Sequence, residues 1–362
     1  MNRKNLLLAF AATLVTLVVA EVAMRVALPL PGVSPVPADA VPGLLIPHPT
    51  RHYAYTPNFV GQLRTENYGI DIRINSLGLR DESIEPGDTV DILAVGDSYT
   101  AGYGVQAEER WSSHLEAYIN STSVLPGETT VANAAVSGYS LTQIRLLIEE
   151  VVHLNPKIVV LGLYPPANFR RLDPYVYHNG HAIVRSMTPY VKPTDDAILY
   201  SPIENRELQR IHFWCMENFH LGARTILLFH DSKERAKQTP DNNLPPGGGS
   251  VTLLDEVGML NRMLSDRGIG LVVLVVNHQM EDGTFDARDK LLTAEIVKYC
   301  RRARITVFDP MPVLESTAAS RPIYRFPNDH HWTAAAHAMV GTKLGEFMLQ
   351  HQWIVDWLQR AP

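Results

Sequence analysis

Five short apolar runs recur along the chain, and each is nearly continuous rather than alternating between apolar and polar residues. They are Val90–Val95, Thr130–Ala134, Ile158–Leu163, Leu271–Val276 and Ile305–Asp309. A short continuous apolar run is typical of a strand that is buried on both faces of a parallel sheet. We therefore expect these runs to form the core strands of one sheet.

Segments with apolar residues at helical spacing lie between and after the runs. They are Glu108–Asn120, Leu141–Leu154, Leu253–Arg267, Ala287–Arg302 and Ala334–Gln350. Alternating strands and helices predict an α/β fold, with a doubly wound, mostly parallel five-stranded sheet between two helix layers. In such sheets the ligand site lies at the carboxyl ends of the strands. The residues that follow each run are therefore the candidate site.

The N-terminus has the layout of an export signal. A basic head at residues 1–5 precedes a charge-free stretch from Leu6 to Ala20, as in a signal peptide. Two outcomes are open. Cleavage could follow Ala20, or residues 6–28 could remain as an anchor, being long enough to span about 30 Å of hydrocarbon. We expect residues 1–28 to be a signal anchor or signal peptide. The body would then be membrane-anchored or secreted, and periplasmic or at the cell surface.

The rest of the chain divides into a linker and one domain. Seven prolines between Pro29 and Pro49 predict a semi-rigid linker over residues 29–50. Residues 51–362 are expected to form the domain, with residues 165–250 as an insertion after the third strand. This insertion contains a strand-like run, Thr225–His230, and a tract rich in proline and glycine near its end.

Composition excludes several classes of protein. Hydrophobic residues are 46% of 362, which excludes a disordered chain. A formal net charge of −6, with no basic run beyond the N-terminus, argues against nucleic-acid binding. Cys215 and Cys300 cannot form a disulfide framework or a zinc site, and whether they pair is open. Phosphate-loop and dinucleotide glycine patterns are absent, so no cofactor is expected.

The residues after the first strand have two interpretations. Gly96-Asp97-Ser98 follows Val95, at an expected strand-to-helix turn. Asp97 or Ser98 could cap the next helix by accepting hydrogen bonds from its free amides. Alternatively, Ser98 could be a nucleophile at the sheet edge, with its own backbone amide donating to an oxyanion.

Later strand ends carry weaker signals. Gly138 follows the second strand and is either a loop glycine or an unhindered amide donor. Asn168 follows the third strand and is either a turn residue or a side-chain amide donor.

A histidine cluster near the C-terminus completes the candidate chemistry. Asp329, His330 and His331 precede the last helix, and His337 lies within it. A histidine beside a carboxylate provides a general base with its orienting acid. The alternatives are a metal site formed by these four residues, or surface histidines without a role.

Together these four stretches resemble the SGNH (GDSL) hydrolase superfamily in chain order, over about residues 50–350. Asn75-Ser76-Leu77-Gly78-Leu79-Arg80-Asp81 and Gly102-Tyr103-Gly104-Val105 look like stretches of its membrane-anchored bacterial members. The spacing of Asp329, His331 and Trp332 looks like that of polysaccharide O-acetyltransferase relatives. One departure is Phe169, which stands where the superfamily usually has aspartate after the asparagine.

The resemblance implies a role for each matching residue. Ser98 attacks an ester carbonyl, His331 accepts its proton, and Asp329 orients the imidazole. The amides of Ser98 and Gly138 and the side chain of Asn168 form the oxyanion hole. No metal is implied.

The expected function is that of an exported serine esterase that removes an acyl group, foremost acetyl, from a carbohydrate or small ester. One alternative is an O-acyltransferase that uses the same triad on an envelope polysaccharide or exopolysaccharide. The other is a catalytically idle glycan-binding or assembly subunit.

Overall fold

The computed structural model describes residues 3–27, 41–165, 176–178, 181–183 and 250–360, apart from residues 42, 49, 66, 82–83, 85–86, 319–322 and 328. Several sequence predictions concern residues outside these ranges. Asn168, Cys215, the run Thr225–His230 and most of the expected insertion lie outside the described residues.

The core is a parallel five-stranded sheet with the strand order β11-β10-β7-β5-β6. Its strands are β5 (Ile92–Val95), β6 (Val131–Asn133), β7 (Ile158–Leu163), β10 (Gly270–Val275) and β11 (Thr306–Phe308). The predicted fold class is confirmed. The chain passes from β5 to β6 on one side of β5 and then to β7 on its other side, so the strand order reverses at β5. In doubly wound sheets, ligands bind where the strand order reverses.

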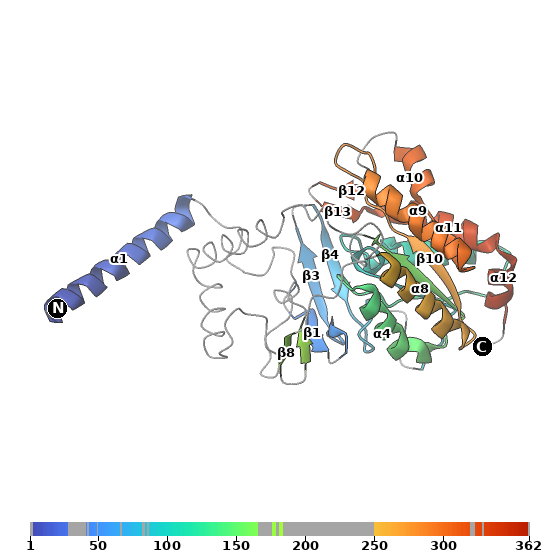
Figure 1. Ribbon diagram of the computed structural model, residues 1–362, viewed down its shortest axis with the longest axis horizontal. Helices are drawn as coiled ribbons and strands as arrows, with labels where there is room; N and C mark the ends of the chain where they lie inside the picture. The colour runs from blue at the N-terminus through green and yellow to red at the C-terminus, as the bar shows by residue number, and fades with distance from the viewer. Residues whose placement is uncertain are drawn as a thin grey trace.

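Helices cover both faces of the sheet (Figure 1). One face packs against α4 (Leu141–Val151), α8 (Ser250–Ser265) and α9 (Ala287–Arg302). The other packs against α3 (Trp111–Ser121), α10 (Met311–Ala318), α11 (Ala334–Leu349) and α12 (Gln352–Leu358). Alternate residues of each strand join one core or the other, which explains why the strands have continuous apolar sequences.

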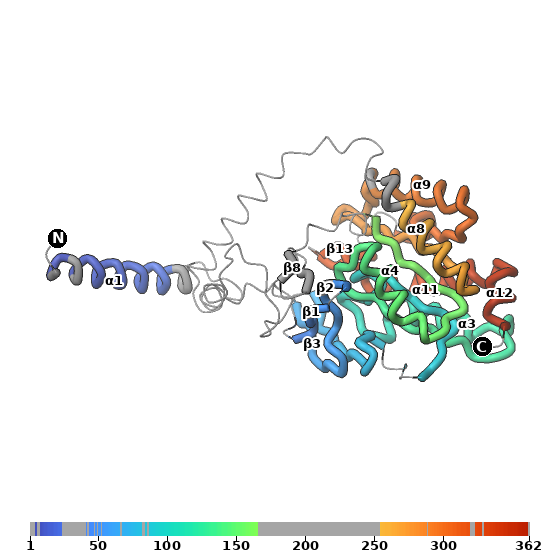
Figure 2. The backbone as a smooth tube through the Cα atoms, turned by 60° about the horizontal axis from the view of Figure 1, so that its bottom comes forward, coloured from blue at the N-terminus to red at the C-terminus, as the bar shows by residue number. Residues whose placement is uncertain are grey.

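Two antiparallel hairpins precede the sheet in the sequence. Strand β1 (Leu45–His48) pairs with β2 (His52–Tyr55), and β3 (Val60–Arg64) pairs with β4 (Gly69–Arg73). These hairpins were not predicted from the sequence, and β1 lies within the range expected to be linker. Their buried side chains belong to the same core as α4 and α8. Figures 1 and 2 show the hairpins at the end of the domain where β13 (Asp329–Trp332) lies.

The N-terminal segment forms helix α1 (Arg3–Ala27), and many of its apolar side chains are exposed. Within the described ranges, no helix combines the length and the apolar character needed to cross a membrane.

Short strands also lie outside the sheet and the two hairpins. Strands β8 (Val176–His178) and β9 (His181–Ile183) form an antiparallel pair, and β12 (Arg325–Phe326) pairs with β13. Cys300 on α9 is a buried free thiol, and burial raises its pKa to about 12.

Candidate active site

Ser98 is the first residue of helix α2 (Ser98–Ala101), and only Gly96 and Asp97 separate it from the carboxyl end of β5. Asp97 caps this helix, because its carboxylate accepts a hydrogen bond from the Tyr99 amide at 3.1 Å. The two interpretations of this turn thus apply to different residues. Asp97 is the cap, and the Ser98 hydroxyl is available for other partners.

Glycine is required at the start of the same turn. A Cβ atom at Gly96 would collide with the Thr100 side chain and with the carbonyl of Gly162 on β7. The missing side chain therefore lets the turn pass close to the neighbouring strand. This close approach fixes the position of Ser98 at the sheet edge.

Strand β13 brings His331 and Asp329 to Ser98. His331 Nε2 lies 2.8 Å from Ser98 Oγ, and His331 Nδ1 lies 2.6 Å from Asp329 Oδ1. These distances are within hydrogen-bond range. With a proton on Nδ1, Nε2 can accept the hydroxyl proton of Ser98. The structure thus brings together the three side chains that the sequence analysis grouped.

Asp329 is held by three donors. Its Oδ1 accepts from the His331 side chain and from the His331 backbone amide at 2.9 Å, and its Oδ2 accepts from the Tyr68 hydroxyl at 2.9 Å. Burial alone would raise the pKa of Asp329. The interactions with His331 and Tyr68 outweigh burial and hold this pKa well below its usual range. The carboxylate therefore stays charged beside the imidazole.

Two hydrogen bonds hold β13 in place, one from helix α2 and one to the chain that follows β10. The Tyr99 hydroxyl donates to the His330 carbonyl at 2.8 Å, and the Trp332 indole donates to the Asn277 carbonyl at 2.7 Å. The ring of Tyr103 also packs against His331, with centroids 4.5 Å apart. These contacts hold the imidazole beside Ser98.

His330 occupies a different place from His331. Its ring stacks on His331 at a centroid distance of 4.7 Å, and it is His331 that contacts Ser98. Partial burial, and secondarily the neighbouring His331, lower the pKa of His330 to about 4. His330 is therefore neutral at neutral pH, and the choice of His331 as the candidate base agrees with the geometry.

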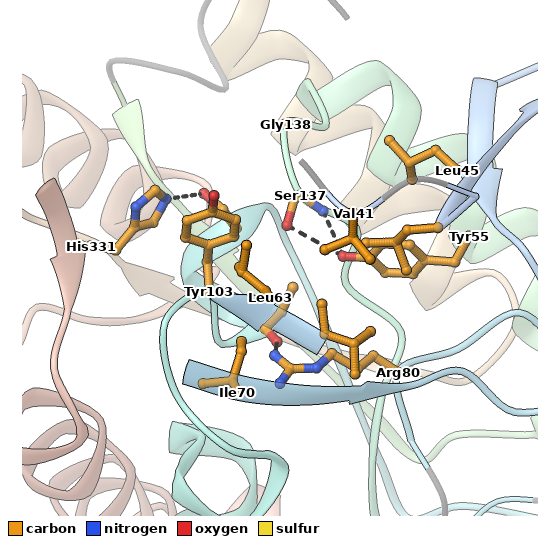
Figure 3. Close-up of a pocket in the computed structure, with 14 residues that line it drawn as sticks. Val41, Leu45, Tyr55, Leu63, Ile70, Arg80, Tyr103, Ser137, Gly138 and His331 are labelled. Atoms are coloured by element: carbon orange, nitrogen blue, oxygen red, sulfur yellow. Dashed lines mark hydrogen bonds between the residues drawn. The ribbon is translucent and has the colours of Figure 1, made fainter. Parts of the chain in front are cut away.

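The loop after β6 presents the second candidate oxyanion donor. Gly138 has a φ of 79°, a left-handed conformation that favours glycine. The preceding residue, Ser137, is fixed by two tyrosines of hairpin β1–β2. Its amide donates to the Tyr55 hydroxyl at 3.2 Å, and its carbonyl accepts from the Tyr53 hydroxyl at 2.9 Å. Gly138, Ser98 and His331 line one cavity (Figure 3).

The Ser98 and Gly138 amides make no hydrogen bond with other parts of the described chain. They are available to a ligand oxygen. The third expected donor, Asn168, lies outside the described residues.

The stretch ending in Arg80 and Asp81 supports the nucleophile helix. Arg80 donates from Nη1 to the Ala101 carbonyl at 2.6 Å, and Asp81 accepts from the Asn133 amide at 2.7 Å. The Asn133 side chain in turn donates to the Thr100 carbonyl at 2.7 Å. All five residues are buried, so these bonds are shielded from water and tie α2 to the end of β6.

The metal alternative has no support in the described structure. No group of three or more His, Cys, Asp or Glu side chains among the described residues is arranged to hold a metal ion. His337 is buried on α11, where its Nδ1 accepts from the Trp111 amide at 3.2 Å.

Tyr68, Tyr53 and Tyr55 were not predicted from the sequence as residues that support the site. Each contacts a site residue or its loop from a hairpin that the sequence pattern did not reveal. The aromatic residues of these segments were the one available signal, and aromatic residues are common in any strand.

No family model and no curated protein sequence matches the chain. Several solved structures are similar. One is a lipolytic protein of the G-D-S-L family from Veillonella parvula, 12% identical, with a TM-score of 0.40 over 73% of this chain and 100% of that one. Another is an acetylxylan esterase from Geobacillus stearothermophilus, 10% identical, with a TM-score of 0.41 over 75% of this chain and 98% of that one. A lipase/acylhydrolase from Enterococcus faecalis is 12% identical, with a TM-score of 0.41 over 72% of this chain and 96% of that one.

Proposed function

We propose that the chain is a serine hydrolase that works through an acyl-enzyme, and more specifically an ester hydrolase of the SGNH (GDSL) type. The observation that carries this proposal is the continuous hydrogen-bonded series from Ser98 Oγ through His331 to Asp329. This is the arrangement that a nucleophile, its general base and an orienting acid require.

In the proposed reaction, Ser98 Oγ attacks the ester carbonyl carbon while His331 Nε2 takes the hydroxyl proton. The negative oxygen of the tetrahedral intermediate accepts hydrogen bonds from the Ser98 and Gly138 amides. His331 then protonates the leaving alcohol as its bond to carbon breaks, which leaves Ser98 acylated. Water attacks this ester with His331 again as base, and the acid and free Ser98 are released. Asp329 stabilises the imidazolium in both halves.

The leaving group and the location belong to the proposal as well. A carbohydrate or small alcohol as leaving group rests on the family resemblance. Export of the domain, by an anchor or a cleaved signal, rests on the basic head and charge-free stretch of residues 1–20. Expression in a bacterial host followed by external protease treatment tests the location. Cleavage of the body in cells with a permeabilised outer membrane is expected, whereas full protection with cytoplasmic activity would contradict export.

Ester hydrolysis by purified variants tests the reaction. With p-nitrophenyl butyrate, Ser98→Ala and His331→Ala should each lower kcat by about 10⁴-fold or more, as for other serine triads. Ser137→Ala changes another serine of the same cavity and should stay within about threefold of wild type. Equal turnover by wild type and a folded Ser98→Ala variant would refute the proposal. Adding an unacylated oligosaccharide shows whether a sugar hydroxyl competes with water for the acyl group.

A further inference from the structure

A cavity adjoins the candidate nucleophile on the side of the Gly138 loop. Its lining includes His331 and Gly138 (Figure 3) together with Ser98, and its volume is about 200 Å³. One water molecule occupies about 30 Å³ of the liquid. The cavity is therefore much larger than the methyl group of an acetyl ester needs.

The two N-terminal hairpins contribute much of the aliphatic part of the cavity wall. Leu45 comes from β1, Leu63 from β3, and Ile70 and Ile72 from β4. Each of these side chains is at most 5% exposed. Aliphatic side chains thus surround a space that ends at the reacting serine. Water molecules in an apolar cavity find few hydrogen-bond partners, so such a cavity favours an apolar ligand.

Most polar side-chain atoms of Tyr55 and Arg80 at the wall have partners inside the protein. The Tyr55 hydroxyl is hydrogen-bonded to Ser137. Arg80 directs its Nη atoms to the carbonyls of Ala101, Gly102 and Val105. Its Nε has no hydrogen-bond partner among the described residues. This atom is a reason to test a charged chain end alongside apolar ones.

We propose that this cavity binds the acyl part of the substrate, and that this part is an unbranched apolar chain several carbons longer than acetyl. This inference rests on the proposed function and departs from the acetyl group that the family resemblance suggested. The cavity suits the acyl side because a carbohydrate leaving group would bury hydroxyls without partners among aliphatic side chains, which is costly. Residues 45–72 then determine the acyl specificity.

Two ester series on the full-length protein separate the acyl side from the alcohol side. In the first, the alcohol is p-nitrophenol and the acyl group lengthens from acetyl to butyryl, hexanoyl and octanoyl. Each buried methylene contributes up to about fourfold in kcat/KM, so hexanoate should exceed acetate by at least about tenfold. In the second, alkyl acetates from methyl to hexyl should differ by less than about threefold. Hydrolysis of p-nitrophenyl hydrogen succinate should be slower than that of butyrate.

Substitution of Leu63 tests the location of the chain. Leu63→Trp fills the cavity and should abolish the preference for hexanoate over acetate. Val60 lies on the same strand but is 69% exposed, so Val60→Trp is the matched control and should keep the wild-type series. If Leu63→Trp fails to fold, Leu63→Ala enlarges the cavity and should shift the optimum to a longer chain.

The outcomes separate this inference from the proposed function. A flat acyl series, a preference for succinate over butyrate, or a steep alkyl acetate series would each overturn the acyl-chain assignment while ester hydrolysis stands. An unchanged hexanoate preference in folded Leu63→Trp would also overturn it. Loss of all turnover on Ser98→Ala substitution confirms the reaction independently of chain length. No turnover of any ester by wild type would refute the proposed function itself.

Discussion

At the scale of single residues, the charge on Asp329 is maintained by neighbours from distant parts of the sequence. Tyr68 lies 261 positions away in the chain and donates to the carboxylate oxygen that His331 does not use. Its hydrogen bond both stabilises the charge and fixes the plane of the carboxylate. Tyr68 is therefore a positioning residue, which acts on the reaction through Asp329 and His331.

Replacing Tyr68 by phenylalanine should lower kcat by about tenfold, because a hydrogen bond to a charged group contributes roughly 1.5–3 kcal/mol. The variant should also need a higher pH for full kcat, because loss of the Tyr68 hydrogen bond raises the pKa of the Asp329 carboxyl toward its usual value. Rate profiles that extend from neutral to acid pH measure both effects.

The matched control is Tyr324→Phe. The hydroxyl of Tyr324 is buried but has no hydrogen-bond partner among the described residues, so kcat and its pH profile should stay unchanged. Equal profiles for wild type and Tyr68→Phe would show that Tyr68 only fills space.

The residues of the candidate triad could be predicted from the sequence because each lies in a short pattern at the end of an element. Ser98 follows an apolar strand and a glycine, and His331 precedes a clear helix with an aspartate two positions before it. Tyr68 and Tyr55 have no such local pattern. Their contacts depend on the path of the chain between the hairpins and the sheet, which a local pattern does not contain.

At the scale of elements, the hairpin β1–β2 sets the conformation of the loop that carries Gly138. Tyr53 and Tyr55 bind the two sides of Ser137, and the Tyr139 hydroxyl donates to the Tyr53 carbonyl at 2.5 Å. The loop is therefore held on both sides of Gly138. A rigid loop keeps its amide aimed at the place where the oxyanion forms, without reorganisation during the reaction.

Tyr55→Phe removes the acceptor of the Ser137 amide and should lower kcat by about 10- to 100-fold with little change in KM. The physical reason is that the Gly138 amide acts mainly in the transition state. Steady-state kinetics with the butyrate ester measure both parameters.

Ser137→Ala removes the weaker side-chain contact at 3.3 Å and leaves the amide in place, so it is the control on the same loop. If Tyr55→Phe changes KM and not kcat, the hairpin acts in substrate binding and not in loop positioning.

The strands of the sheet and the hairpins differ in how well their sequences predict them. Strand β7 was predicted with its observed bounds, Ile158–Leu163, because both of its faces are buried and every residue is apolar. The hairpin strands have four or five residues, and in β3 and β4 most residues are not buried. Prolines before and within β1 indicated a linker instead. Only packing against the sheet stabilises such short strands.

At the scale of the whole molecule, buried neutral histidines make stability depend on pH. His337 is 0% exposed. Burial, followed by the charges of His114 and Arg110, lowers its pKa to about 3. In an unfolded chain a histidine has a pKa of about 6.5. Between these values the unfolded chain binds a proton that the folded chain does not bind, so stability falls as the pH falls.

His337→Gln should therefore flatten the dependence of the unfolding free energy on pH between about 6.5 and 4. The expected difference in slope is about 1 kcal/mol per pH unit. Urea denaturation at a series of pH values measures it, and the slope is informative even where the variant is less stable overall. The depressed pKa of Asp329 acts in a lower window, since its contribution is lost as the pH falls below about 4. Parallel curves for wild type and His337→Gln would contradict this origin of acid sensitivity.

The central claim is that Ser98, activated by His331, is the nucleophile. The most direct measurement is intact-mass and peptide mapping after reaction with a hexyl fluorophosphonate, which forms a stable adduct with an activated serine. We predict one adduct per chain at Ser98, none in Ser98→Ala, labelling at least about a thousandfold slower in His331→Ala, and wild-type labelling in Ser137→Ala. An adduct on another residue, or labelling of Ser98 at the same rate without His331, would contradict the account.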